Sequence, residues 1–69
     1  HYPLFEFWTV ERNLREAARH AGLKRKEAAD KTKAILETFD LTKQQDLYPV
    51  QLSGGQLQRA AIAVQQAHG

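Results

Sequence analysis

The stretch Leu52-Ser53-Gly54-Gly55-Gln56, followed by Leu57-Gln58-Arg59, decides the fold of this 69-residue chain. Ser53 is a residue type that commonly begins helices, because its hydroxyl accepts a hydrogen bond from the first turn. Apolar residues recur after it at helical spacing: Leu57, Ala60, Ala61, Val64 and Ala67. This pattern predicts a helix over residues 54–67 that buries one narrow face, with Ile62 pointing away from it.

The start of this helix has the chemistry of an anion site. Gly54 and Gly55 lack a Cβ atom, so an anion can approach their backbone amides closely. The helix dipole places roughly half a positive charge at the same end. The amide group of Gln56 offers a further donor. These residues therefore predict a site suited to a phosphate group.

Two more helices are expected upstream. Thr9 is a plausible N-cap for a helix over 10–21, which ends before Gly22 as a left-handed residue. A second helix is predicted over 25–39, with Asp40 in the left-handed position after it. The apolar positions that support these helices are Val10, Leu14, Ala17, Ala18 and Ala21 in the first, and Ala28, Ala29, Thr32, Ile35, Leu36 and Phe39 in the second.

The remaining segments are short. Thr42 is expected to begin a helical turn that runs through Leu47 and ends at Tyr48-Pro49. Residues 1–8 are interpreted as an extended aromatic lead-in, because Pro3 disfavours helix around it. No segment alternates with period two, so no strand is expected. The predicted fold is an all-α bundle of three helices plus one short helix, in a single domain over residues 1–69.

Composition excludes several classes of function. The chain has no cysteine, which excludes disulfides, thiolate zinc sites and cysteine nucleophiles. No stretch approaches the roughly 20 apolar residues of a membrane span, and the N-terminus has no signal-peptide pattern. His1, His20 and His68 do not have the spacing of metal ligands, so no metal site is expected, and His20 is interpreted as a surface residue.

The LSGGQ stretch with Gln58-Arg59 resembles the signature motif of the ABC transporter ATPases, and its flanks agree. Leu4-Phe5, Thr9-Val10 and Asn13-Leu14 resemble the segment after the Q-loop of that family, and Asp46-Leu47-Tyr48-Pro49 resembles the "DRYP" before the signature. Glu6, Arg12 and Val64-Gln65-Gln66 depart from the common residues. The resemblance implies that residues 1–69 form the helical subdomain of the nucleotide-binding domain, with residues 1–8 as the lead-in after the Q-loop.

The resemblance also implies functional roles. Ser53, Gly54, Gly55 and Gln56 would contact the γ-phosphate of ATP bound by the opposite subunit of a head-to-tail dimer. Phe7 and Trp8 would contact the transmembrane permease subunit, while Phe5 is assigned to the core. ATP and Mg²⁺ are cofactors of the complete domain, and this segment alone is expected to bind neither. Because proteins of this family are subunits of transporters, the resemblance implies a cytoplasmic location at the membrane surface, where the protein is bound to the permease.

Catalytic residues are not expected in this chain, because no glycine precedes a lysine as a P-loop requires. The family's Walker B strand and switch histidine are likewise absent. The expected partners are the rest of the ATPase domain, a second nucleotide-binding subunit and the permease.

An uneven charge distribution leaves a second interpretation open. The net charge is +2, but residues 9–33 hold eight basic residues against four acidic ones. A basic helical module that binds nucleic acid or a protein is therefore the alternative, with Gln56, Gln58 and Arg59 as a weak imitation of a recognition helix. The signature context favours the ATPase interpretation, in which no nucleic acid is expected.

Overall fold

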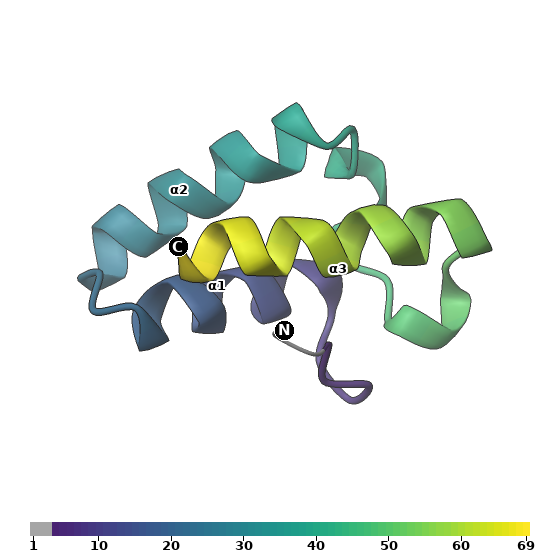
Figure 1. The fold of residues 1–69 in the computed structure, drawn as a ribbon, viewed down its shortest axis with the longest axis horizontal. Helices are drawn as coiled ribbons and strands as arrows, with labels where there is room; N and C mark the ends of the chain where they lie inside the picture. Colours follow the sequence, from purple (N-terminus) through teal and green to yellow (C-terminus); the bar gives the residue numbers. More distant parts are fainter. Residues whose placement is uncertain (1–3) are drawn as a thin grey trace.

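The fold is all-α, and three α-helices follow one another in a computed structural model that describes residues 4–69 (Figure 1). These helices are α1 (Val10–His20), α2 (Arg25–Thr38) and α3 (Gly54–His68). Two single 3₁₀ turns, η1 (Thr42–Gln44) and η2 (Pro49–Gln51), connect α2 to α3. No strand occurs in residues 4–69, so the predicted fold class is confirmed. The helices match the predicted ones to within one residue at each end, whereas the turn predicted through Leu47 is shorter and η2 was not predicted.

The core lies where α1, α2 and α3 meet, with α1 packed against both other helices. Alanines contribute much of the core surface of α1 and α3, and their short side chains allow the two helices to approach closely. Larger side chains fill the space towards α2 and η1. The buried cluster consists of Val10, Leu14, Ala17, Ile35, Leu36, Leu41, Ala60, Ala63, Val64 and Ala67.

Both left-handed positions predicted after helices are confirmed. Gly22 has φ of 102° and Asp40 has φ of 55°. The amide after Gly22, that of Leu23, bonds back to Ala18 O at 3.2 Å, and the amide of Leu41 bonds to Leu36 O at 2.8 Å. Each left-handed residue therefore turns the chain while the last helical carbonyls keep hydrogen-bond partners.

Three side chains that the helical spacing placed on buried faces are exposed instead. Ala21 and Ala29 lie on solvent-facing positions, and Leu57 is 40% exposed. Leu57 sits in the first turns of α3, which extend beyond the start of α1 in Figure 1. The apolar periodicity predicts which residues share one face of a helix, but it does not show how far the neighbouring helix extends. This explains why Leu57 was predicted to be buried. Ile62 is exposed, as the pattern predicted.

The lead-in was predicted to be extended, and its described part is a turn instead. Residues 1–3 lie outside the described residues. Residues 6 and 7 form a turn in which Trp8 N donates to Phe5 O at 3.2 Å. The physical reason is the buried side chain of Asn13, whose Nδ2 donates to the carbonyls of Phe5, Trp8 and Thr9 at 3.0–3.2 Å. Its Oδ1 accepts from Phe5 N at 2.7 Å, so both ends of the Asn13 amide hold the turn.

We expect Asn13→Ala to lower the free energy of unfolding by about 2–3 kcal/mol, because four hydrogen bonds are lost and the amide of Phe5 and the carbonyl of Trp8 lose their partner. In a domain of this size that corresponds to a melting temperature roughly 10–20 °C lower. Urea unfolding followed by circular dichroism measures the change, and Arg19→Ala at an exposed position of the same helix serves as the control. A loss no larger than that of the control would contradict the role given to Asn13.

Candidate anion-binding site and adjoining surfaces

The predicted N-cap of α3 is confirmed as a reciprocal pair of side-chain bonds. Ser53 Oγ accepts a hydrogen bond from Gln56 N at 3.2 Å, and Gln56 Oε1 accepts one from Ser53 N at 3.0 Å. This arrangement is a capping box, which fixes the direction in which the chain enters the helix. Both side-chain oxygens act as acceptors, so the hydroxyl hydrogen of Ser53 and the amide hydrogens of Gln56 remain to donate to a ligand.

The backbone amides of Gly54 and Gly55 have no acceptor among residues 4–69, which sets the start of α3 apart from that of α1. In α1 the corresponding amides of Val10 and Glu11 donate to the carbonyls of Leu47 and Gln45, both at 2.9 Å. Gly54 and Gly55 are exposed, and a Cβ atom built on either one would meet nothing within 4 Å. The start of α3 is therefore open to an anion, whereas that of α1 is already filled by the chain itself.

The structure brings all four predicted phosphate contacts, Ser53, Gly54, Gly55 and Gln56, to one exposed helix start. Their donors are two backbone amides, one hydroxyl and one side-chain amide. The described residues contain no lysine or arginine in this segment, and the nearest such residue in sequence, Arg59, donates through Nε to Phe39 O at 3.2 Å. The site is thus a set of hydrogen-bond donors without a formally charged side chain, which is suited to one face of an anion.

The aromatic residues of the lead-in occupy different environments. Phe7 is 84% exposed, so its ring is accessible, and its role as a contact for the permease stays a prediction. Trp8 is half-buried between the ring of Phe5, with centroids 4.5 Å apart, and the guanidinium of Arg12, 4.6 Å from the ring centroid. The assignment of Phe5 to the core is wrong, because this ring is exposed and packs on Trp8 rather than between the helices.

Phe7 shares an open groove with residues in and just before η2 that were not predicted as contacts. Tyr48 and Val50 face the same groove, together with Glu6 and Gln51. Both Tyr48 and Val50 are exposed large apolar side chains. The only sequence signal was the resemblance of Asp46-Leu47-Tyr48-Pro49 to a family motif, which does not reveal that η2 and the 5–8 turn lie together.

The groove and the anion site are connected by η2. Tyr48 N donates to Gln51 Oε1 at 2.9 Å, and Leu52 N donates to Pro49 O at 3.1 Å. Leu52 packs on the core cluster immediately before Ser53. A single bonded turn therefore separates the exposed apolar side chains from the capped start of α3.

The structure also locates two of the histidines and allows the search for metal sites and membrane spans to be repeated on the fold. His20 is exposed at the end of α1 and stacks on His68 at the end of α3, with ring centroids 5.5 Å apart. Within residues 4–69, no group of three or more histidine, aspartate or glutamate side chains is arranged to hold a metal ion. Within the same range, no helix has the length and apolar character needed to cross a membrane.

Fold and site together define a small all-α unit that presents a glycine-containing helix start beside an exposed apolar groove. Comparison with curated proteins assigns this unit to a family. It is 46% identical over 59 residues to a putative hemin import ATP-binding protein of Staphylococcus haemolyticus. It is 43% identical over 63 residues to a methionine import ATP-binding protein of Streptococcus agalactiae, and 42% identical over 62 residues to an Fe(3+) ions import ATP-binding protein of Rhizobium meliloti.

The chain therefore belongs to the ATP-binding proteins of ABC transporters. The three alignments cover 86%, 91% and 90% of the chain, but they span only 27%, 18% and 16% of the respective relatives. It thus corresponds to a segment of these longer proteins. No family model matches the chain, and no solved structure matches it.

Replacement of Ser53 by alanine is expected to cost about 1 kcal/mol of unfolding free energy, the usual loss when a helix N-cap is removed. Ser53→Asp keeps an acceptor at the cap and places a negative charge at the positive end of the helix, so it should retain the stability of the original chain. Thermal and urea unfolding of both variants measure the difference. Equal losses in Ser53→Ala and Ser53→Asp would show that the capping bond does not stabilise α3.

Proposed function

We propose that residues 4–69 act as the helical subdomain of an ABC transporter ATP-binding protein and present Ser53–Gln56 to the γ-phosphate of ATP bound by the opposite subunit. The relatives are named import ATP-binding proteins, which supports a role in nucleotide-dependent transport. The donors at the start of α3 suit one face of a phosphate. ATP and Mg²⁺ would be held mainly by the remainder of the protein, since this segment contains no P-loop.

The observation that carries this proposal is the presence of two glycines in the first turn of α3 with empty space around them. Glycine costs roughly 0.8–1 kcal/mol relative to alanine inside a helix. Neither glycine has positive φ, and neither is required by a close contact within residues 4–69. Local stability therefore does not explain them. The close approach of a ligand to the exposed amides does, since a side chain there would hinder it.

The variant Gly55→Ala distinguishes the effect of this glycine on stability from its effect on ATP turnover. In the 69-residue chain we expect it to raise the unfolding free energy by about 0.5 kcal/mol, because alanine favours the helix and meets no neighbour. In a complete ATP-binding protein that carries this segment, the same change should lower ATP turnover. Gly55→Asp adds a negative charge against phosphate and should lower turnover about 100-fold or more, the scale expected when a preorganised donor is lost.

Nucleotide affinity of the isolated complete subunit is the control, because the first ATP contacts would belong to its P-loop. Unchanged turnover in Gly55→Asp would contradict the role given to residues 53–56. A parallel collapse of nucleotide affinity would contradict the assignment of the contact to the opposite subunit. Loss of stability in Gly55→Ala would show that the glycine serves the fold.

The second part of the proposal concerns the permease. We propose that Phe7, supported by Trp8, contacts the transmembrane subunit, and that Tyr48 and Val50 extend this contact across the groove. Support comes from the exposure of three large apolar side chains on two neighbouring turns. Such clusters are typical of contact sites with another protein. Because η2 links the groove to Ser53, a permease that moves the residues of the groove would also move the start of α3, which faces the phosphate in this proposal.

Phe7→Ser in a complete transporter is expected to weaken the association of the ATP-binding subunit with the permease at least tenfold, because an exposed aromatic anchor is lost. Nucleotide affinity of the separate subunit should stay unchanged. Phe7→Leu keeps an apolar side chain and is the matched variant that should retain most of the binding. Co-purification and titration of the permease against both variants provide the measurement. Equal binding by Phe7→Ser and the original subunit would remove Phe7 from the contact.

The partners that follow are the rest of the ATP-binding protein, a second nucleotide-binding subunit arranged head to tail, and the permease. This assembly would place the segment on the cytoplasmic side, at the membrane surface. The alternative of a basic nucleic-acid-binding module receives less support from α3, because the exposed Arg59 already uses its Nε in a bond to Phe39 O at 3.2 Å. The basic residues Arg19, Lys24, Arg25 and Lys26 are simply exposed around the turn between α1 and α2.

A further inference from the structure

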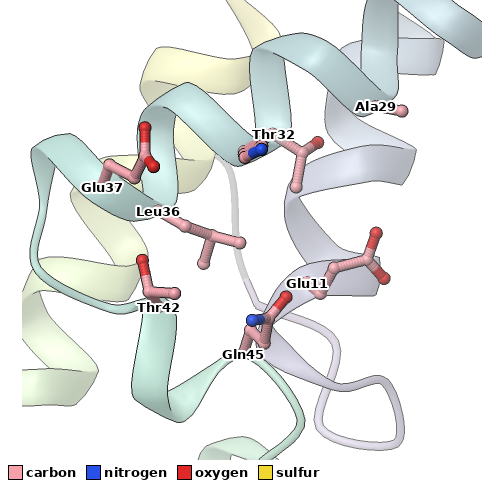
Figure 2. Close-up of a pocket in the computed structure, with 8 residues that line it drawn as sticks. Glu11, Ala29, Thr32, Leu36, Glu37, Thr42 and Gln45 are labelled. Atoms are coloured by element: carbon pink, nitrogen blue, oxygen red, sulfur yellow. The ribbon is translucent and has the colours of Figure 1, made fainter.

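A pocket of about 250 Å³ lies between α1, α2 and η1, away from the anion site (Figure 2). Glu11 comes from α1, Glu37 from α2, and Gln45 follows η1. In Figure 2 these three side chains surround the pocket from different sides. None of residues 52–56 contributes to it, so an inference about this pocket does not depend on the phosphate-binding role proposed above.

A buried hydroxyl group at this pocket lacks a hydrogen-bond partner. Thr32 is 2% exposed, and its Oγ1 bonds to no donor or acceptor within residues 4–69. The Thr32 side chain points from α2 towards α1 in Figure 2. An unpaired buried hydroxyl costs free energy, roughly 1–3 kcal/mol in proteins. Its presence in the wall of the pocket marks a part of the packing between α1 and α2 whose hydrogen bonding residues 4–69 leave incomplete.

The polar groups of the lining favour a cationic donor. Two carboxylates, Glu11 and Glu37, face one ammonium group, that of Lys33, so the formal charge of the lining is negative. Glu11 already pairs with Arg15, with Oε2 3.1 Å from Nε. Glu37 has no ion pair among residues 4–69 and is exposed. Thr32, Thr42 and Gln45 add further oxygen atoms that can accept hydrogen bonds.

The remaining wall is apolar. Leu36 lines the pocket between Thr32 and Glu37 and is itself buried in the core cluster. An occupant that suits both walls needs an aliphatic stem that packs on Leu36. It also needs a cationic head with several donors, which can bond to the oxygen atoms of the polar lining residues. Arginine has this construction, since its stem packs on apolar surface and its guanidinium carries five donors in one plane.

We propose that this pocket binds the side chain of an arginine from a protein partner, with Glu37 as the principal charge contact and Leu36 as the apolar wall. Lys33 lies four residues before Glu37 on α2 and competes with the incoming guanidinium for this carboxylate. The contact is a weak and specific one, to which the rest of the partner would add further surface.

The test uses N-acetyl-arginine amide as the probe and N-acetyl-citrulline amide as its uncharged counterpart of the same shape. Titration of the ¹⁵N-labelled 69-residue chain is followed by backbone amide shifts. The arginine probe is expected to bind at millimolar concentration and to shift the amides of Thr32, Leu36 and Gln45. The citrulline probe is expected to bind at least fivefold more weakly.

Three variants test the individual contacts. Glu37→Gln should weaken binding of the arginine probe at least threefold, and Lys33→Ala should strengthen it. Glu16→Gln is the matched control, because it removes one negative charge of the chain outside the pocket, and binding should change less than twofold. Equal binding of the two probes, absence of shifts at the pocket, or equal effects of Glu37→Gln and Glu16→Gln would each overturn the proposal. Both Glu37 and Lys33 are exposed, so their replacement leaves the core intact.

Discussion

The first turn of α1 holds together the segments that carry the proposed functions. Its amides at Val10 and Glu11 are bonded to carbonyls from residues 45–47, and Thr9 caps the third, that of Arg12. One turn further, the Asn13 side chain binds the backbone of residues 5–9. The aromatic turn and the loop that leads to α3 are therefore both fastened to one helix end. Their relative position is set by directional hydrogen bonds rather than by apolar packing alone.

The helix starts of α1 and α3 differ in how their first backbone amides are hydrogen-bonded. At the start of α1, the first two amides donate to carbonyls of residues 45–47, so they are not available to an anion. The start of α3 keeps only its side-chain cap, and glycine at the next two positions lowers helix propensity while exposing the amides. Natural sequences tend to break local rules at functional sites, which supports the proposal that these two glycines serve a ligand rather than the fold.

Much of this organisation was predictable from local sequence. Thr9, Ser53, Gly22 and Asp40 act on backbone within a few residues of themselves, so their roles could be inferred directly. The exposure of Leu57 and Phe5 could not, because it depends on where neighbouring helices end and how the lead-in turns. The apolar groove and the pocket lined by Glu37 are formed by segments that lie far apart in the sequence. The spacing of residues within a single helix therefore cannot predict them. Asn13 was part of a recognised motif, yet its role as a clamp required the fold.

The projection of α3 beyond α1 has a consequence for motion. Residues 54–58 lie outside the apolar cluster, and their helical form depends on the capping pair and on the helix behind them. Such a terminus opens locally at little cost in free energy, so its amide hydrogens should exchange with solvent much faster than those of residues 60–67. An anion bound to Gly54 and Gly55 would slow this fraying. Hydrogen-exchange protection at the start of α3 would then report occupancy of the site even where the average structure stays the same.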